Sequence, residues 1–334
     1  MKKSYYLFNP GRLTRKDNTL KFAPVDENGV EGPPRYIPVE AVSAFYVFGS
    51  LDANSALYNF LGKNQITVHF FDYYEHYTGS FYPKEYLLAG KMQVAQTLHY
   101  TDLRKRLTLA ARFVDGAAFN MIKNLRYYQN RGKDLEAHIC QMESYAGELF
   151  ACRDIASLMG VEGNIRQIYY QAFDEILRDF VMEGRSKRPP LNEVNTLISF
   201  GNMMCYALCL DMIYHTQLNP TISFLHEPGT RRYSLALDLA EIFKPILVDR
   251  TIFRAINRKE IKPEDFDVKL NSCVLKESGK RTFVTAFEER LKETIQHRTL
   301  KKQVSYKSLA KLECYKLTKH LMEMEEYKPF KIWW

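Results

Sequence analysis

Two patterns of apolar and polar positions divide the chain. Over the first 85 residues, short β-prone runs such as SYYLF, TLKFAP and RYIPV alternate with the turn sequences Asn9-Pro10-Gly11, Asn28-Gly29 and Gly32-Pro33-Pro34. AVSAFYVFG and ITVHFFD predict two further strands, and GSFYP predicts the second arm of a hairpin. One helix is predicted over residues 52–61, with Asp52 as its N-cap. The pattern indicates a small sheet domain.

Beyond this region apolar residues recur at helical spacing. Residues 84–128 predict helix, and IRQIYYQAFDEILRDFV, residues 165–181, follows the i, i+3, i+4, i+7 rule throughout. Further helices are predicted at residues 194–214, from an N-cap at Ser234, and at 284–297 and 304–325. Pro245 is expected to kink or end its helix, and GRSKRPP, residues 184–190, to form a basic loop.

The fold class predicted from these patterns is α+β. A small N-terminal β-sheet domain, residues 1–85, precedes a larger all-helical domain, residues 86–334. No apolar run approaches the ~20 residues needed to cross a bilayer, and the N-terminus lacks the apolar core of a signal peptide. We therefore expect a cytoplasmic protein with no membrane partner.

Charge is distributed unevenly. The net charge is +8, but residues 1–88 hold nine Lys/Arg and nine Asp/Glu, so the excess lies in the second part. Between residues 91 and 133 nine Lys/Arg face two Asp, and aromatic residues lie among them. Cations with aromatic rings suit a nucleic acid, although a solvated helix face would have the same composition. The six cysteines form no Cys-x-x-Cys pair, which favours buried thiols over a zinc site.

The candidate chemistry is a set of acids and one histidine: Glu162, His226, Asp238 and Glu241. Asp238 and Glu241 are three residues apart, so they share a helix face bordered by apolar residues. Two such acids need a metal ion or an arginine between them. Arg231 and Arg232 are close in sequence, so a structural salt bridge remains an equal alternative. By themselves, His226 fits an ordinary loop histidine and Glu162 an acid favoured by the dipole at a helix start.

Longer stretches of the chain resemble the CRISPR-associated integrase family, the universal spacer-acquisition subunit of CRISPR–Cas immunity. The resemblance is nearly full length. It rests on FGSLDANSALYNFLGKNQITVHFFD, on GRSKRPPLNEVNTLISFGNMM, on the terminal YKPFKIWW and above all on HEPGTRRYSLALDLAEIFKPILVDR. This last stretch fixes a histidine, two acids and Asp249-Arg250 in one pattern.

The resemblance implies an N-terminal β domain that dimerises and a helical catalytic domain. It places the metal ligands on Glu162, His226 and Glu241, where many family members have aspartate at the last position. Asp238 matches a further acid, either a support for a ligand or a water-mediated ligand. Oxygen-rich ligation favours Mg²⁺ or Mn²⁺, and the imidazole tilts the choice towards Mn²⁺. The implied partners are DNA, a second copy of the chain and a small dimeric companion protein.

The expected reaction is attack by a DNA 3′-hydroxyl on a phosphodiester of a repeat array, with hydrolysis of branched DNA as the version that uses water. Two alternatives stay open, a non-catalytic architectural DNA-binding subunit and a zinc hydrolase. The candidate DNA-contacting residues are Arg104, Arg126, Lys187, Arg188, Arg231 and Arg232.

Overall fold

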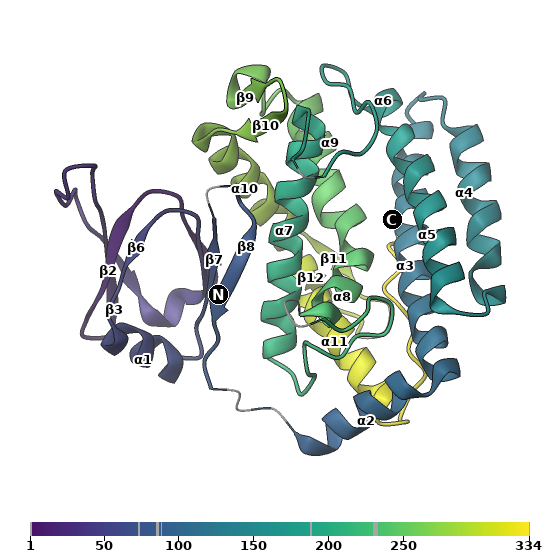
Figure 1. The fold of residues 1–334 in the computed structure, drawn as a ribbon, viewed down its shortest axis with the longest axis horizontal. Coiled ribbons are helices and arrows are strands. Elements are labelled where there is room, and N and C mark those ends of the chain that lie inside the picture. Colours follow the sequence, from purple (N-terminus) through teal and green to yellow (C-terminus); the bar gives the residue numbers. More distant parts are fainter. Residues whose placement is uncertain are drawn as a thin grey trace. The chain divides into compact units, whose positions relative to one another are not determined.

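The computed structural model describes residues 2–72, 74–84, 87, 89–187, 189–229 and 233–333. The chain forms two compact units, residues 1–86 and 87–334. The first is rich in strands and the second in helices, so the predicted fold class is confirmed (Figure 1).

Two four-stranded sheets make up the N-terminal unit. One has the order β1-β5-β7-β8 and the other the order β4-β3-β2-β6. In the first sheet β1, β5 and β7 are parallel and β8 returns antiparallel. The strands are β1 (Lys3–Leu7), β2 (Gly11–Lys16), β3 (Thr19–Pro24), β4 (Arg35–Pro38), β5 (Val42–Val47), β6 (Leu51–Asp52), β7 (Thr67–Phe71) and β8 (Tyr77–Phe81).

Helix α1 (Ser55–Lys63) lies within this unit and begins later than predicted. Asn54, not Asp52, is its N-cap, because the Asn54 side chain accepts a hydrogen bond from the backbone N–H of Leu57 at 2.9 Å. Asp52 belongs to strand β6 instead. The helix buries Leu57, Phe60 and Leu61 in a core that also takes side chains from both sheets.

The C-terminal unit is helical, with two short hairpins that the sequence patterns did not predict. Its helices are α2 (Gly90–Thr101), α3 (Leu103–Gln129), α4 (Glu136–Glu148), α5 (Ile155–Gln171), α6 (Phe173–Ile176), α7 (Glu193–Tyr214), α8 (Ser234–Lys244), α9 (Arg250–Asn257), α10 (Glu277–Lys292) and α11 (Tyr306–Leu321). The hairpins pair β9 (Phe266–Lys269) with β10 (Ser272–Leu275) and β11 (Thr294–Gln296) with β12 (Gln303–Ser305).

Helix α7 is the central element of this unit. It packs against α8, which packs on α3, and α3 in turn contacts α4 and α5 (Figure 1). Among the described residues α7 is the one helix long and apolar enough to cross a membrane by length and composition, but 83% of that window is buried inside the protein. Such burial is typical of the core helix of a globular domain.

Several predicted helix boundaries were wrong for local reasons. The single helix expected over residues 84–128 is two helices, because the Asp102 carboxylate accepts hydrogen bonds from the N–H groups of Arg104 and Lys105 and starts α3 afresh. Ser234 is the first residue of α8, and its hydroxyl binds the Thr221 carbonyl rather than capping the helix. Helix α4 was not predicted, and α10 begins seven residues earlier than expected.

The α-helix α8 ends at Lys244 with Pro245 as its C-cap, as predicted, but the chain remains helical beyond it. Residues Pro245–Asp249 form a π-helical segment that runs directly into α9. Proline lacks an N–H, so it fits at the start of such a segment. Gly201 of α7 allows a close approach here, since a Cβ at that position would clash with the side chain of Val248. Helices α8 and α9 are therefore joined by a helical segment without an intervening loop.

Candidate active site

Asp238 on α8 is the anchor of the loop that carries His226. Its side chain is fully buried and accepts hydrogen bonds from the backbone N–H groups of Phe224 at 2.7 Å, Leu225 at 3.0 Å and His226 at 3.0 Å. It also accepts one from the His226 ring, whose Nδ1 lies 2.8 Å away. Both carboxylate oxygens are thereby occupied, which makes Asp238 a positioning residue for the loop and its histidine.

The contact with Asp238 fixes the tautomer of His226. An Nδ1–H that donates to a carboxylate leaves Nε2 with its lone pair available. The ring is about one quarter exposed, and in the described part of the chain Nε2 makes no hydrogen bond. This is the arrangement of a histidine that ligates a metal ion.

A second clamp holds the same loop from α3. Arg106 is buried and donates from Nε to the Phe224 carbonyl at 2.9 Å and from Nη2 to Glu227 at 2.6 Å. Tyr100 donates to the other Glu227 oxygen at 3.0 Å, and its ring packs under the Arg106 guanidinium. Arg106, counted among the possible DNA-binding cations of residues 91–133, is therefore a structural residue.

Glu162 lies in the interior of α5, not at the helix start as predicted. Helix α5 begins at Ile155, where Asp154 and Ser157 form a capping box. Glu162 is thus two turns inside the helix, where the dipole of the N-terminus has little effect. Gly160 and Gly163, on either side of Glu162 in the sequence, face open space.

Arg166 joins Glu162 to Glu241. Its guanidinium contacts Glu162 through Nε and Glu241 through Nη2, with all three side chains less than one fifth exposed. Lys244, one turn after Glu241, donates to the other Glu241 oxygen at 2.7 Å. The acids on α5 and α8 therefore lie within the span of one guanidinium group.

These contacts determine the charge states. Burial by itself would raise the pKa of Glu162, but the Arg166 guanidinium outweighs it and the pKa is lowered, with Lys244 acting in the same direction. Burial, followed by the charge of Arg166, lowers the pKa of Lys244 to about 8.

The structure brings Glu162 and Glu241 together and brings His226 to Asp238, but it does not assemble the predicted ligands around a common point. Among the described residues no group of three His, Cys, Asp or Glu side chains could hold a metal ion as placed, and Arg166 lies between the two glutamates. The bridge expected between Asp238 and Glu241 is not what Arg166 provides: Asp238 binds the His226 loop, and Arg166 links Glu241 to Glu162 instead. The donor types still fit a divalent cation, because two buried carboxylates and an imidazole nitrogen are ligands that Mg²⁺ or Mn²⁺ accepts.

The basic loop of residues 184–190 is pinned to the start of α7 near these acids. Asn195 accepts a hydrogen bond from the Ser186 N–H at 3.0 Å and donates to the Gly184 carbonyl at 2.9 Å. It also accepts from Arg185 at 2.9 Å. Burial and then the charge of Arg185 lower the pKa of the exposed Lys187, and Glu162 raises it. Lys187 itself is an exposed residue of this loop.

The other predicted DNA contacts have varied surroundings. Arg104 is exposed on the first turn of α3. Arg126 is half exposed but forms an ion pair with Glu143 of α4. Arg188, Arg231 and Arg232 lie outside the described residues.

Three residues that hold the candidate site together were not predicted from the sequence: Arg166, Lys244 and Arg106. The first two had a local signal, because Arg166 follows Glu162 by four residues and Lys244 follows Glu241 by three, the spacings at which helical side chains meet. Arg106 had none, since its partners are more than 100 residues away.

Comparison with known proteins identifies the family. Residues 5–289 match the model of the CRISPR associated protein Cas1 family. The chain is 48% identical over its full length to the full-length CRISPR-associated endonuclease Cas1 2 of Thermodesulfovibrio yellowstonii. It is 45% identical over its full length to the CRISPR-associated endonuclease Cas1 of Fusobacterium nucleatum, of which it covers 98%.

Solved structures show the same fold. A Cas1 protein from Thermotoga maritima superimposes with a TM-score of 0.86 at 38% identity, over 98% of this chain and 99% of that one. A casposase bound to its integration product gives 0.87 at 20% identity, over 99% and 93% of the two chains. A chain of a Cas6-RT-Cas1–Cas2 complex gives 0.83 at 18% identity, over all of this chain and 36% of that one. The resemblance seen in the sequence is confirmed, and the chain belongs to the Cas1 family of CRISPR-associated endonucleases.

Proposed function

We propose that this protein is a metal-dependent DNA endonuclease and integrase of CRISPR spacer acquisition, which joins a DNA 3′-hydroxyl to a phosphodiester of the repeat array. One observation carries the proposal. Two buried carboxylates from separate helices, Glu162 and Glu241, meet at the Arg166 guanidinium, and Asp238 on the same helix as Glu241 sets the tautomer of His226. The family indicates the reaction class, and this geometry supports the choice of residues.

The proposed ligands are Glu162, His226 and Glu241, and the ion is Mg²⁺ or Mn²⁺. Such an ion supplies Lewis-acid activation of the attacking oxygen and neutralises charge that develops on the phosphate. Arg166 would give up its place between the glutamates to make room for the ion. The chain then needs no covalent nucleophile of its own, since the attacking group belongs to DNA or water.

The protein's own part is to orient the donors and attract the phosphate. Asp238 and Arg106 hold the His226 loop from opposite directions, so the imidazole is preorganised. Lys244 balances the charge of Glu241. Lys187 is exposed on the loop that Asn195 holds at the start of α7, and a positive side chain there favours an approaching phosphodiester.

The proposed partners are DNA, a second copy of this chain and the small dimeric companion protein of spacer acquisition. Support comes from the solved Cas1–Cas2 complex that shares this fold. We propose that residues 1–85 form the dimerisation domain and residues 86–334 the catalytic domain, in a protein of the cytoplasm with no membrane partner. Buried α7 is consistent with that location.

The Arg166 bridge favours one alternative, a non-catalytic DNA-architectural subunit. If the bridge were permanent, the carboxylates would be structural and the cations alone would act. A zinc hydrolase remains the third possibility, because one histidine and two carboxylates also hold Zn²⁺.

The test is strand transfer by Glu162→Gln and His226→Ala with Mn²⁺, compared with DNA affinity. We expect both variants to lose joining while they keep their affinity, whereas the exposed matched acid Glu148→Gln keeps both. Normal joining by both variants would show that the metal assignment is wrong, whereas DNA binding without any joining by the wild-type protein would leave the architectural role. Activity restored by Zn²⁺ but not by Mn²⁺ would indicate the hydrolase.

A further inference from the structure

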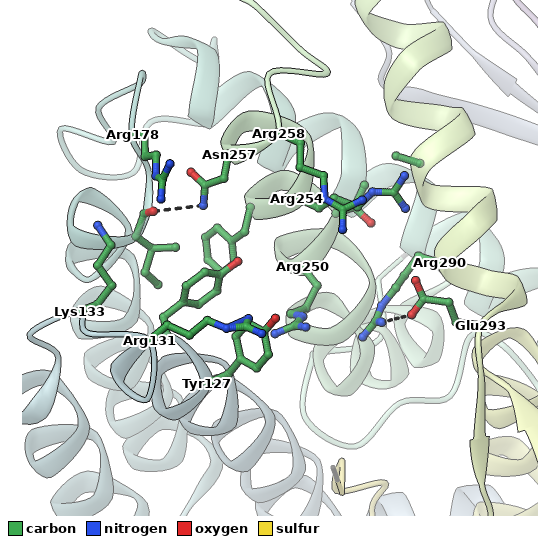
Figure 2. A pocket seen from close by; sticks show the side chains of 15 residues that line it. Tyr127, Arg131, Lys133, Arg178, Arg250, Arg254, Asn257, Arg258, Arg290 and Glu293 are labelled. Carbon is green, nitrogen blue, oxygen red and sulfur yellow. Dashed lines mark hydrogen bonds and ion pairs between the residues drawn. The ribbon is translucent and has the colours of Figure 1, made fainter.

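A second concentration of charge lies away from the carboxylates, in a pocket of about 600 Å³ between the end of α3, the segment after α6, and helices α9 and α10. We call it the basic pocket. Its charged lining consists of seven cations and one carboxylate, Arg131, Lys133, Arg178, Arg250, Arg254, Arg258, Arg290 and Glu293. Figure 2 shows Lys133 and Arg178 on one side and Arg254, Arg258 and Arg290 on the other.

Only part of this positive charge is balanced. Arg254 pairs with Glu260 and Glu289, and Arg290 pairs with Glu293. In the described part of the chain, by contrast, Arg131, Lys133 and Arg178 have no carboxylate within ion-pair distance. Like charges gathered in a hollow repel one another unless an anion enters. The unbalanced side of the basic pocket is therefore an anion-binding surface.

The pocket also holds its cations in place without neutralising them. The guanidinium groups of Arg131 and Arg250 lie 3.9 Å and 4.0 Å from the centroid of the same ring, that of Tyr127. Stacking on the Tyr127 ring orients the Arg131 guanidinium, and in the described part of the chain no hydrogen bond or ion pair occupies its N–H donors. A guanidinium held in this way can donate to a phosphate group that enters the pocket.

The basic pocket is connected to the candidate active site through packed rings. Tyr169 and Phe173 lie at the C-terminal end of α5 with ring centroids 5.2 Å apart, Phe173 packs on Phe253 at 4.6 Å, and Phe253 packs on Tyr128 of the pocket at 5.3 Å. Glu162 precedes Tyr169 by seven residues, which is roughly 10 Å along the helix. The pocket is thus a separate place on the same rigid framework.

We propose that the basic pocket binds phosphate groups, and that it is a second phosphate site distinct from the carboxylates. The shared chemistry is a run of closely spaced phosphates, and the two possible sources are a DNA single strand and a free polyphosphate. The DNA source rests on the proposed function, in which a strand must be held beyond the reacting phosphodiester. Guanidinium contacts to phosphate would position a strand without specifying its sequence.

The test compares Arg131→Ala/Arg178→Ala with the matched control Arg153→Ala/Arg298→Ala. Both pairs are exposed and remove the same charge, but only the first lines the basic pocket. Binding of a fluorescent 20-nucleotide DNA strand is measured against salt in EDTA, so that catalysis plays no part. If a DNA strand occupies the pocket, we expect the first variant to bind the strand about 10-fold more weakly. The slope of log affinity against log salt concentration should be smaller by about 1, with little change in the control.

The second arm uses inorganic tripolyphosphate and thermal unfolding. If the ligand is a free polyphosphate, it raises the melting temperature of the wild-type protein but not of the pocket variant, and strand affinity is unchanged. The proposal is overturned if the two double variants behave alike in both arms. Because no metal is present, that failure is distinguishable from failure of the proposed strand-transfer reaction, which Glu162→Gln tests by itself.

Discussion

The candidate active site and the basic pocket treat charge in opposite ways. Around Glu162 and Glu241 nearly every charge has a partner within the protein, and Asp238 spends both its oxygens on one loop. In the basic pocket three cations have no carboxylate partner among the described residues. A region whose charges are balanced internally keeps its geometry before a substrate arrives, which suits chemistry. A region with unbalanced charge gains only when an anion binds, which suits affinity.

The strongest test of this difference measures variants of both regions in the same strand-transfer assay. Glu162→Gln should lower single-turnover strand transfer by roughly 1000-fold or more, since loss of a metal ligand removes several kcal/mol of stabilisation. Arg131→Ala/Arg178→Ala should keep that rate within about two-fold once DNA is saturating. Rates are measured in Mn²⁺ at several DNA concentrations. A pocket variant that loses its saturated rate would contradict the division of labour.

Asp238→Asn tests whether preorganisation matters inside the active site. The asparagine NH₂ group is a donor, so it cannot accept the hydrogen bonds that one carboxylate oxygen accepts in the wild type. The amide also no longer favours the Nδ1–H tautomer of His226. We expect activity to fall about 10- to 100-fold and more Mn²⁺ to be needed for half-maximal rate. Asp154→Asn is the control, because asparagine caps a helix as well as aspartate does. An unchanged Mn²⁺ requirement would show that Asp238 acts only on folding.

Buried Asp249 should make the stability of the folded protein depend on pH. Burial raises its pKa to about 7, although a hydrogen bond with Tyr169 and the charge of Arg166 favour the ionised form. The folded protein therefore binds more protons than the unfolded chain between about pH 4 and 7, and this contribution to stability is lost as the pH rises through 7.

In Asp249→Asn that loss should disappear. Unfolding by urea from pH 5 to 8 is expected to show a free energy of unfolding that falls by roughly 2–3 kcal/mol less in the variant than in the wild type. Parallel pH profiles for the two proteins would mean that Asp249 is ionised throughout.

The smallest effect is expected where a charge has an exposed partner. Arg126 and Glu143 form an ion pair with both side chains nearly half exposed. A double-mutant cycle with Arg126→Ala and Glu143→Ala should give a coupling below about 1 kcal/mol, with DNA affinity reduced less than by the pocket variant. A larger loss of affinity in Arg126→Ala would extend the DNA-binding surface from the basic pocket along α3.

Much of the fold could be predicted because hydrophobic periodicity is local. The change from strands to helices, the length of α7 and the apolar face of α8 all appear in the sequence. Predicted helix boundaries were wrong where a single polar side chain sets the start of a helix. Asn54 and Asp102 do so by accepting hydrogen bonds from nearby backbone N–H groups. The two C-terminal hairpins were missed because strands of three or four residues carry little periodic signal.

For the function, the sequence by itself determined the family, the reaction class and the identity of the candidate ligands, because motif residues keep their spacing along the chain. Only the tertiary structure decided what each of them does. In the folded protein Asp238 binds the His226 loop, and Arg106 binds the same loop from α3. Arg166 lies between two glutamates that are 79 positions apart in the sequence. It also gathered the basic pocket from α3, α9, α10 and the segment after α6. Charge acts through space, so its balance is settled only when distant segments meet.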